Sequence, residues 1–314
     1  MMPAPTLSHL ADRLPPLRGR VQADAPMAPH AWFRVGGAAE ALVRPADVAD
    51  LAGLLRALPP EVPVTVLGAA SNVIVRDGGV PGVVLRLARG FADVAVEADG
   101  VVAGAGALDA TVAEHAAAGG LAGLEFLSGI PGSIGGAVAM NAGAYGGDVA
   151  GCLDWAEVVT RSGEQVRLPA ATLALAYRHA SLPSGAVVVR ARLRAQPGDP
   201  AAIAARMAAI RASREATQPV RARTGGSTFR NPEGSSLRAW ELIDAAGGRG
   251  LVRGGAQCSD KHCNFLLNTG AATAADLEGL GEELRRRVQA ASGIVLEWEI
   301  KRVGMPAPRA EVVV

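Results

Sequence analysis

The amino-acid sequence predicts an α+β protein, in which short strands and hairpins are interspersed with a few separate helices. The chain has 314 residues, of which 49% are apolar, so it can bury a sizeable core and form about two domains. Short apolar segments bounded by Gly, Pro and Ser predict strands. Apolar residues at helical spacing occur in only a few stretches, which end at Gly or Pro.

Most predicted elements lie in an N-terminal part, residues 26–198, which follows an arm of residues 1–25. Residues 47–58 carry apolar side chains at helical spacing and stop at two prolines, which predicts a helix. Residues 63–68 predict a buried strand that runs into a small-residue turn. The remaining predictions are strands and hairpins at 82–87, 91–106 and 156–168, turns at Gly100 and Ser162-Gly163, and a helix at 108–120.

The C-terminal part is predicted to span residues 199–302 and to be followed by a tail, 303–314. Its first helix begins at Pro200 behind the capping residue Asp199. A loop rich in Gly, Ser and Thr is predicted after Pro219. The second helix starts at Thr273, in a capping box with Asp276. The residues predicted to face inward are Ile203, Met207 and Ile210 on the first helix and Leu277, Leu280, Leu284 and Val288 on the second. The second helix is predicted to end at Gly293, and one strand is predicted within 294–303.

The charges and apolar runs argue against a nucleic-acid-binding or membrane protein. The net charge is +1, which gives no bulk attraction to nucleic acid or to a membrane surface. No apolar segment follows the basic N-terminal residues, so we expect no secretory signal. The uncharged run 126–147 is long enough to cross a bilayer, but its glycines and Pro131 make it a poor spanning helix. We expect it to form loops and turns.

The cysteines predict a cytoplasmic protein without a metal site. Cys152, Cys258 and Cys263 are an odd number in a long chain, so a disulfide framework is not expected and a reducing compartment fits better. Although His262 lies between Cys258 and Cys263, a metal site needs at least one more convincing pair of ligands. We therefore expect buried thiols.

The stretch "LGAASNVIVRDGG" (67–79) is a strand followed by a turn of small residues. Backbone N–H groups in such a turn can converge on an anion, and Ser71 and Asn72 add polar side chains. Neither the Rossmann fingerprint nor the phosphate-binding P-loop is present. By itself, this stretch is better explained by a tight turn with no function.

The stretch "GIPGSIGGAVAMNAGAYGG" (129–147) is built mostly from Gly and Ala. Glycines let a ligand approach the backbone, at about 0.5–1 kcal/mol each relative to Ala in regular structure. Close packing of the protein against itself is the structural alternative. Two anion-friendly loops in one domain, together with Asn141 and Tyr145, favour a dinucleotide with a pyrophosphate.

Some residue types are scarce in this Ala-, Gly- and Arg-rich chain, and their surviving copies are candidates for chemistry. These are Lys261 and Lys301, Tyr145 and Tyr177, and Asn72, Asn141, Asn231, Asn264 and Asn268.

Seven blocks, in order, resemble the UDP-N-acetylenolpyruvoylglucosamine reductase family, and the resemblance covers about residues 30–302. They are "WFRVGG" (32–37), "GAASNVIVRDGGVPG" (68–82), "GLEFLSGIPGSIGGAVAMNAGAYGGD" (123–148), "YR" (177–178), "GGSTFRNP" (225–232), "KHCNFLLN" (261–268) and "LEWEIK" (296–301). The resemblance implies an FAD-binding domain of the vanillyl-alcohol-oxidase-like (PCMH-type) fold, made of two subdomains, and a smaller α+β domain that closes over the substrate. The compact C-terminal part is similar to the shorter, type II subgroup.

The resemblance also implies which residues contact FAD. These are Gly68, Ala69, Ala70, Ser71 and Asn72 in the first loop, and Ile130, Pro131, Gly132, Ser133, Gly135, Gly136, Asn141, Ala142 and Gly143 in the second. The family loop usually has Gly where this chain has Ala70. The turn must therefore have a negative φ at Ala70 or carry mild strain.

The family reduces an enolpyruvyl ether on a UDP-sugar, UDP-N-acetylglucosamine enolpyruvate, with NADPH as hydride donor through FAD. Hydride addition leaves negative charge on the α carbon and its carboxylate, which a guanidinium and an acidic donor would stabilise before a proton arrives. By motif, Arg178 and Glu299 take the two stabilising roles and Ser227 gives the proton. The family's Glu precedes an apolar residue and a base, which selects Glu299 over Glu297.

For the substrate, the same blocks offer six further residues. Asn231 and Lys301 are the first candidates for the UDP-sugar, Lys261 and His262 are candidates for phosphate or uridine, and Tyr145 and Tyr177 line the substrate or nicotinamide channel. Lys301 stands where the family commonly has Arg. We expect a monomer or a weak oligomer.

Two alternatives remain beside this reading. One is a flavin oxidase or dehydrogenase of the same fold with another substrate, against which "GGSTFRNP" and "LEWEIK" argue. The other is a non-catalytic flavin- or nucleotide-sugar-binding module, against which the presence of Arg178, Ser227 and Glu299 argues.

Overall fold

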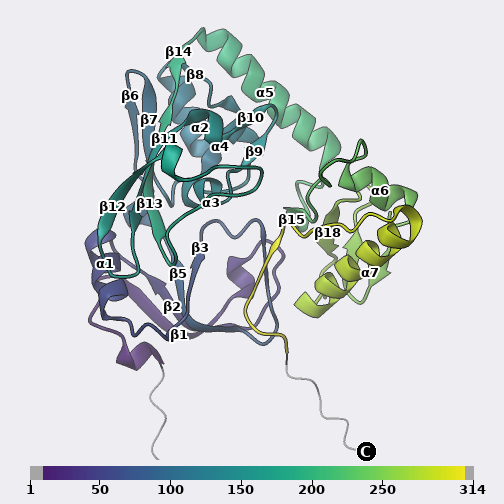
Figure 1. Cartoon of the computed structure of the whole chain (residues 1–314), viewed down its shortest axis with the longest axis horizontal. Coiled ribbons are helices and arrows are strands. Elements are labelled where there is room, and N and C mark those ends of the chain that lie inside the picture. Colours follow the sequence, from purple (N-terminus) through teal and green to yellow (C-terminus); the bar gives the residue numbers. More distant parts are fainter. Residues whose placement is uncertain (1–9, 308–314) are drawn as a thin grey trace, which may run out of the picture. The chain divides into compact units, whose positions relative to one another are not determined.

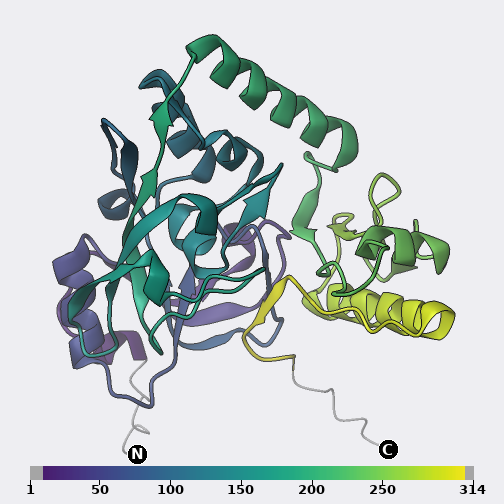
Figure 2. The same cartoon turned by 45° about the horizontal axis from the view of Figure 1, so that its top comes forward.

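The structure is a computed structural model, and it describes residues 10–307. The outer parts of the expected arm and tail, residues 1–9 and 308–314, lie outside the described residues. By their contacts the residues form two compact units, and Figures 1 and 2 show their elements from two directions. The first unit comprises residues up to 25, 39–68 and 81–203, and the second comprises 26–38, 69–80 and the chain from 204 onward.

The first unit is built on two sheets. The four-stranded sheet has the order β1-β2-β5-β3, in which β3 and β5 are parallel. Its strands are β1 (Arg20–Pro26), β2 (Ala38–Arg44), β5 (Val80–Arg86) and β3 (Val64–Leu67). The antiparallel five-stranded sheet has the order β12-β11-β13-β7-β6. Its strands are β12 (Gln165–Pro169), β11 (Leu153–Val159), β13 (Val187–Arg194), β7 (Gly100–Gly104) and β6 (Val94–Glu97).

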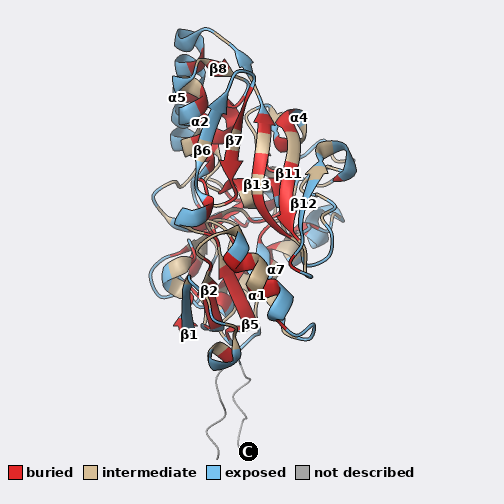
Figure 3. Cartoon of the chain, turned by 90° about the vertical axis from the view of Figure 1, so that its left-hand side faces the viewer, coloured by how far each residue is buried: buried red, intermediate tan, exposed pale blue. Residues whose placement is uncertain are grey.

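Burial in the five-stranded sheet falls from its centre to its edges. The middle strands β11, β13 and β7 are largely buried, whereas β6 and β12 are exposed, as Figure 3 shows. Arg192 on β13 ties three segments together, because its guanidinium contacts Glu97 at 2.8 Å, Asp99 at 2.6 Å and Asp154 at 2.9 Å. A charge on a central strand is thereby fully paired.

The remaining elements of the first unit are short helices and two-stranded pairs. The helices are α1 (Val48–Ala57), α2 (Asp109–Ala118), α3 (Ile134–Ala139) and α4 (Val149–Cys152), with the 3-10 helices η1 (Leu10–Arg13), η3 (Arg89–Phe91), η4 (Glu125–Gly129) and η5 (Ala170–Thr172). The strand pairs are β9 (Gly143–Ala144) with β10 (Gly147–Asp148), and β8 (Leu121–Ala122) with β14 (Gln196–Pro197). The predicted helices at 47–58 and 108–120 are confirmed as α1 and α2.

The second unit packs helices against a four-stranded antiparallel sheet of order β15-β18-β17-β16. Its strands are β15 (Arg223–Ser227), β18 (Phe265–Asn268), β17 (Ala256–Cys258) and β16 (Val252–Arg253). The helices α6 (Ala239–Ala245) and α7 (Ala274–Ser292) contribute to one core with Phe33, Phe229 and Leu266. A short parallel pair joins β4 (Val73–Val75) to β19 (Lys301–Val303), and η2 (Ala28–His30) lies near the start of this unit. Helix α5 (Pro200–Thr217) begins in the first unit and continues into the second.

Both long predicted helices of the C-terminal part are confirmed. The backbone N–H groups of Ala201 and Ala202 donate to the Asp199 carboxylate at the start of α5. Thr273 and Asp276 form the expected capping box of α7, and Gly293 ends this helix with a φ of 74°. A left-handed backbone conformation at the end of a helix favours glycine.

Several local predictions are wrong, mostly where glycine is dense. The run 126–147 contains α3 as well as loops, because Ile134, Ala137 and Val138 are buried and tertiary packing outweighs low helix propensity. The loop expected after Pro219 includes strand β15. The following boundaries also differ. The turn of the β6–β7 hairpin lies at 98–99, so Gly100 begins β7, and residues 20–26 of the arm form β1. The last predicted strand is reduced to 301–303 and an isolated bridge from Trp298 to Phe229.

Within residues 10–307, no helix is long and apolar enough to cross a membrane. Cys152, Cys258 and Cys263 are free and buried, and burial raises the pKa of the Cys258 thiol to about 12. These thiols are therefore protonated and unreactive at neutral pH.

Candidate active site

The first candidate loop follows β3, and its first glycine lies against the second candidate loop. A Cβ atom added to Gly68 would lie 2.2 Å from the Ser133 Oγ. That hydroxyl is buried and has no hydrogen-bond partner within residues 10–307. The two sequence stretches predicted to bind one ligand therefore touch each other inside the first unit, and an unsatisfied hydroxyl lies at their meeting point.

Most glycines in 129–147 are required by the protein's own packing. Added Cβ atoms on Gly132, Gly135, Gly143 and Gly147 would each come within 3.0 Å of another side chain. The N–H groups of Ile134 and Gly135 donate to Ala107 and Ala105, at 3.0 and 2.9 Å. Gly136 differs, because it is exposed and a Cβ there would meet only the Ser133 Oγ, at 3.9 Å. Close packing thus explains much of this stretch, and the surface at Gly136, next to the buried Ser133 hydroxyl, is open for a ligand.

Asn141 is buried and uses its side chain to hold two other segments. Its Nδ2 donates to the Ala176 carbonyl at 2.9 Å, and its Oδ1 accepts from the Ala150 N–H at 2.8 Å. Ala176 and His179 exchange two backbone hydrogen bonds of 3.0 Å, so Tyr177 and Arg178 form the tip of a tight turn. Asn141 therefore positions the turn that carries Arg178.

Arg178 lies at this tip with a φ of 55°, and its guanidinium lies 5.1 Å from the centre of the Tyr177 ring. Tyr177 is 54% exposed. Tyr145 occupies a similar place, at the tip of the β9–β10 hairpin with a φ of 53°. Both turns present a large side chain from a tightly constrained backbone.

Left-handed backbone at residues other than glycine is concentrated in the motif blocks. Ala70, Asn141, Tyr145 and Arg178 all have a φ between 43° and 55°. At Ala70 the structure therefore has the strained alternative, with a φ of 51°, at a cost of about 1–2 kcal/mol. Strained residues of this kind cluster at functional sites, where the surrounding structure enforces them.

Ser227 ends strand β15 of the second unit beside an irregularity in the strand pairing. The register between β15 and β18 shifts between Thr224 and Ser227, where Gly226 has a φ of 78°. Such a bulge turns the following side chain out of the regular alternation. Ser227 is half-buried, and the next residue, Thr228, is fully buried.

Glu299 is bound directly to the segment that carries Ser227. Its N–H donates to the Thr228 carbonyl at 2.8 Å. The Asn264 side chain fixes the other side of this segment, since it accepts from the Phe229 N–H at 2.9 Å and donates to the Phe229 carbonyl at 2.8 Å. The structure thus brings the "GGSTFRNP" and "LEWEIK" blocks together. Arg178, by contrast, belongs to the first unit.

The "GAASN" turn reaches the same place from the other side of Glu299. The Asn72 Nδ2 donates to the Glu299 carbonyl at 3.3 Å, and the Lys301 N–H donates to the Asn72 carbonyl at 3.1 Å. Parallel pairing of β4 with β19 continues this contact. One residue of the predicted flavin loop therefore holds the backbone of a predicted catalytic residue.

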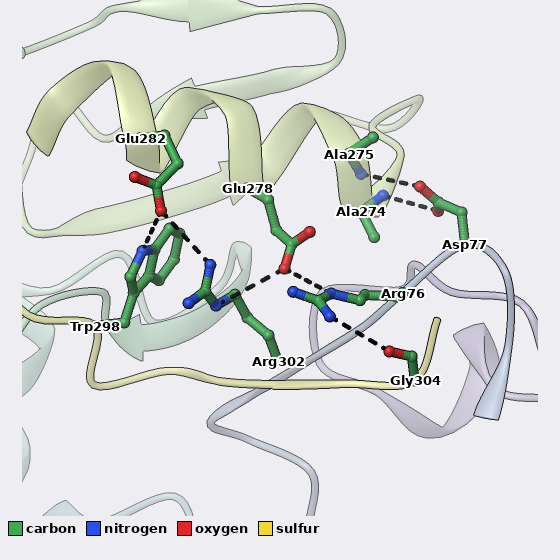
Figure 4. A network of polar contacts seen from close by, with 9 residues as sticks. All are labelled: Arg76, Asp77, Ala274, Ala275, Glu278, Glu282, Trp298, Arg302 and Gly304. Atoms are coloured by element: carbon green, nitrogen blue, oxygen red, sulfur yellow. Dashed lines mark hydrogen bonds and ion pairs between the residues drawn. The ribbon is translucent and has the colours of Figure 1, made fainter. Parts of the chain in front are cut away.

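Helix α7 anchors both strands of this pair (Figure 4). The Asp77 carboxylate accepts from the N–H groups of Ala274 and Ala275, at 2.9 Å each, at the start of α7. Arg76 pairs with Glu278 at 3.0 Å, and Arg302 approaches Glu278 and Glu282 at 3.8 and 3.5 Å. Trp298 Nε1 donates to Glu282 at 2.8 Å. These charge-assisted contacts hold the segments beside and around Glu299 against α7, and so they fix the position of its backbone.

The remaining substrate candidates lie in the second unit. The Lys261 Nζ donates to the Glu215 carbonyl, and the Asn231 Oδ1 accepts from the Ala239 N–H at 3.1 Å, at the start of α6. The His262 ring lies edge-on to Trp240 and Phe265, at 6.2 and 4.8 Å between ring centres. Burial lowers the pKa of His262, so its ring is neutral near pH 7 and better suited to an aromatic base than to phosphate.

Asn264 and Asn268 are two positioning residues that sequence reasoning noted as scarce but did not assign. Asn268 donates from Nδ2 to the Phe33 carbonyl at 2.7 Å and so ties the "WFRVGG" block to β18. The scarcity of Asn in this chain was the available signal.

Replacing Gly68 with alanine is expected to weaken FAD binding about tenfold or more, because the new methyl group would displace the Ser133 Oγ. Removing that oxygen as well should relieve the clash, since the Ser133 Cβ would lie 3.6 Å from the added methyl group. The double variant Gly68→Ala/Ser133→Ala is therefore expected to recover the affinity lost to the clash, and to bind FAD as well as the single variant Ser133→Ala, which lacks only the hydroxyl contact. Quenching of flavin fluorescence on binding measures both. Equal loss in the single and double variants would contradict this explanation.

Comparisons with known proteins agree with these observations. The profile of the C-terminal domain of UDP-N-acetylenolpyruvoylglucosamine reductases matches residues 218–303, and a profile of FAD-binding domains matches residues 39–169. The chain is 67% identical over 306 residues to the UDP-N-acetylenolpyruvoylglucosamine reductase of Acidiphilium cryptum, covering 98% of each chain. It is 66% identical over 290 residues to that of Granulibacter bethesdensis, covering 92% of this chain and 93% of the relative.

A solved structure gives the same answer for the fold. The crystal structure of this reductase (MurB) from Thermus caldophilus aligns with a TM-score of 0.78 at 36% identity, covering 92% of this chain and 100% of that one. The predicted fold class, an FAD-binding domain joined to a smaller α+β domain, is thereby confirmed. The chain belongs to the UDP-N-acetylenolpyruvoylglucosamine reductase family.

Proposed function

We propose that this chain catalyses the NADPH-dependent, FAD-mediated reduction of UDP-N-acetylglucosamine enolpyruvate to UDP-N-acetylmuramate, a step of peptidoglycan precursor synthesis. The observation that carries this proposal is the hydrogen bond from the Glu299 N–H to the Thr228 carbonyl, which places Glu299 next to the Ser227 segment. An acid and a hydroxyl held on adjacent backbone segments suit the protonation of a carbanion beside a carboxylate.

The chain's small-residue loops fit FAD. The open surface at Gly136, the unsatisfied Ser133 hydroxyl and the narrow space at Gly68 suit a polar group that lies close to the backbone. When bound, FAD supplies hydride transfer between NADPH and the enolpyruvyl group. The proposed FAD contacts are those named from the sequence in the segments 68–72, 130–136 and 141–143.

The remaining steps belong to the side chains of the chain itself. Arg178 binds and orients the substrate carboxylate, and Glu299 stabilises the negative charge that develops on it. Ser227 holds the proton that the α carbon receives. Asn231, Lys261, His262 and Lys301 bind the UDP-sugar, and Tyr145 and Tyr177 line its approach. We further propose a cytoplasmic enzyme of the shorter subgroup, acting as a monomer or weak oligomer.

The test is spectroscopic. The purified protein is expected to be yellow, to lose its flavin absorbance when NADPH is added without oxygen, and to recover it when UDP-N-acetylglucosamine enolpyruvate follows. A protein that never takes up FAD is incompatible with the proposal. A protein that NADPH reduces but this substrate does not reoxidise would instead be a flavin enzyme with another substrate.

A further inference from the structure

Asp109 is a buried carboxyl group that the proposed reaction does not use. It is the first residue of α2, it is 0% exposed, and neither of its carboxyl oxygens has a hydrogen-bond partner within residues 10–307. Burying an ionised carboxyl group without partners is costly, so such a group is stable only when it is neutral or compensated by hydrogen bonds or opposite charge.

The carboxyl group faces the proposed flavin loop, residues 130–136. The Oδ2 of Asp109 lies 2.4 Å from the position of a Cβ on Gly132, and 3.5 Å separates that position from the nearest Ile130 side-chain carbon. The Asp109 N–H donates to the Gly132 carbonyl at 3.2 Å. Only glycine, which has no side chain, fits at position 132 beside the Asp109 carboxyl group.

Among residues 10–307, no charged side chain compensates Asp109. The elements packed against α2 are η4, β8, β6 and β7. Their titratable side chains are Glu125, which accepts from the Gly123 N–H at 2.9 Å, and Glu97, which pairs with Arg192. On α2 itself lie Glu114 and His115. Burial alone raises the pKa of Asp109 to about 8, so the group is protonated at neutral pH.

Asp50 shows what this chain does with a buried carboxylate that is meant to be charged. It lies in the first turn of α1, is 7% exposed, and accepts backbone N–H groups from Arg18, Gly19 and Ala46 at 2.8–3.0 Å. Burial opposes ionisation, but these hydrogen bonds outweigh it and lower the pKa of Asp50. Asp109 and Asp50 are thus two buried aspartates with opposite protonation.

We propose that Asp109 is a positioning residue that couples FAD binding to the uptake of one proton from solvent. The inference rests on the proposed FAD contact of the 130–136 loop, and takes that contact to be with the pyrophosphate. Ionised Asp109 would place a negative charge against Gly132, opposite the phosphates, and like charges at short range disfavour each other. The proton forms one O–H bond on the carboxylate, and no other bond changes.

The sign of the pH dependence follows from this coupling. Below about pH 7, Asp109 already carries its proton, and FAD affinity does not depend on it. Above about pH 8, Asp109 is ionised in the apoprotein, so FAD binding requires that it take up a proton from solvent. Affinity is then expected to fall about tenfold between pH 7 and pH 9, with half a proton to one proton taken up at about pH 8.5.

The experiment is calorimetric titration of FAD into the apoprotein at pH 8.5, in two buffers with different ionisation enthalpies. The native chain is expected to take up protons, and Asp109→Asn should bind FAD without proton uptake and with an affinity that is flat from pH 7 to pH 9. Asp109→Leu is the second variant, and it should also be flat. Asp50→Asn is the matched control and should keep the proton uptake.

Each outcome decides a different question. Equal proton uptake by the native chain and Asp109→Asn, or no uptake by the native chain, overturns the role of Asp109. Failure of the native apoprotein to bind FAD at any pH overturns the proposed function instead.

Discussion

Replacing Ser227 with alanine is expected to leave the reduction of the flavin by NADPH intact and to slow its reoxidation by UDP-N-acetylglucosamine enolpyruvate about 10²–10⁴-fold. The substitution removes only the hydroxyl group. The bulge at Gly226 and the hydrogen bonds of Thr228 and Phe229 to Asn264 involve backbone atoms of the Ser227 segment, so they persist. The loss therefore reports on proton donation and not on folding.

The measurement is stopped-flow absorbance of the oxidised flavin, recorded separately for the two half-reactions. Ser292→Ala is a suitable control, because the Ser292 hydroxyl makes local contacts at the end of α7, where it donates to the Val288 carbonyl and accepts from the Ile294 N–H. It should leave both rates unchanged. Reoxidation of Ser227→Ala at a near-native rate would remove Ser227 from the mechanism.

Replacing Glu299 with alanine is expected to lower kcat for reoxidation about 10²–10³-fold, with a smaller effect on KM, because the lost interaction is strongest when charge develops in the transition state. Glu299→Gln keeps a hydrogen-bond donor and should recover part of the rate. The backbone contacts of Glu299 with Thr228 and Asn72 survive both changes.

Glu297 provides the matched control two residues earlier. Its side chain is 76% exposed and lies 3.9 Å from Arg230, an ion pair of little energetic weight. Glu297→Ala should retain kcat within about twofold, as is usual for an exposed pair. A large loss in Glu297→Ala with little loss in Glu299→Ala would reverse the assignment of these two residues.

Local signals in the sequence identified the helices that carry their own boundaries. Helix α7 has a Thr273–Asp276 capping box and a terminal glycine, and α5 has Asp199 and Pro200 at its start. Helix α3 and strand β15 lack such signals, because Gly135, Gly136, Gly225 and Gly226 have weak intrinsic preferences. Close contacts determine their conformation: a Cβ on Gly225 would lie 2.3 Å from the Phe33 ring.

The scarce asparagines also show the difference between what the sequence predicts and what tertiary contacts decide, here within the candidate site. All five fall in or beside the motif blocks, and the structure gives each of their side chains a hydrogen bond to a backbone group. Asn141 holds the turn of Arg178, and Asn72 and Asn264 hold the segments of Glu299 and Ser227. The sequence predicted ligand contacts for Asn72, Asn141 and Asn231, because composition can indicate that a side chain is needed but cannot indicate which atom it binds.

The sequence by itself determined the fold class, the family and the order of the blocks that carry the chemistry. Only the tertiary structure decided how these blocks meet, because hydrogen bonds such as Glu299 to Thr228 join residues far apart in the chain. It also decided why 129–147 is so rich in glycine. Gly132 leaves room for the buried carboxyl of Asp109, and Gly135 packs on Ala105, so much of the missing side-chain volume is occupied by the protein itself.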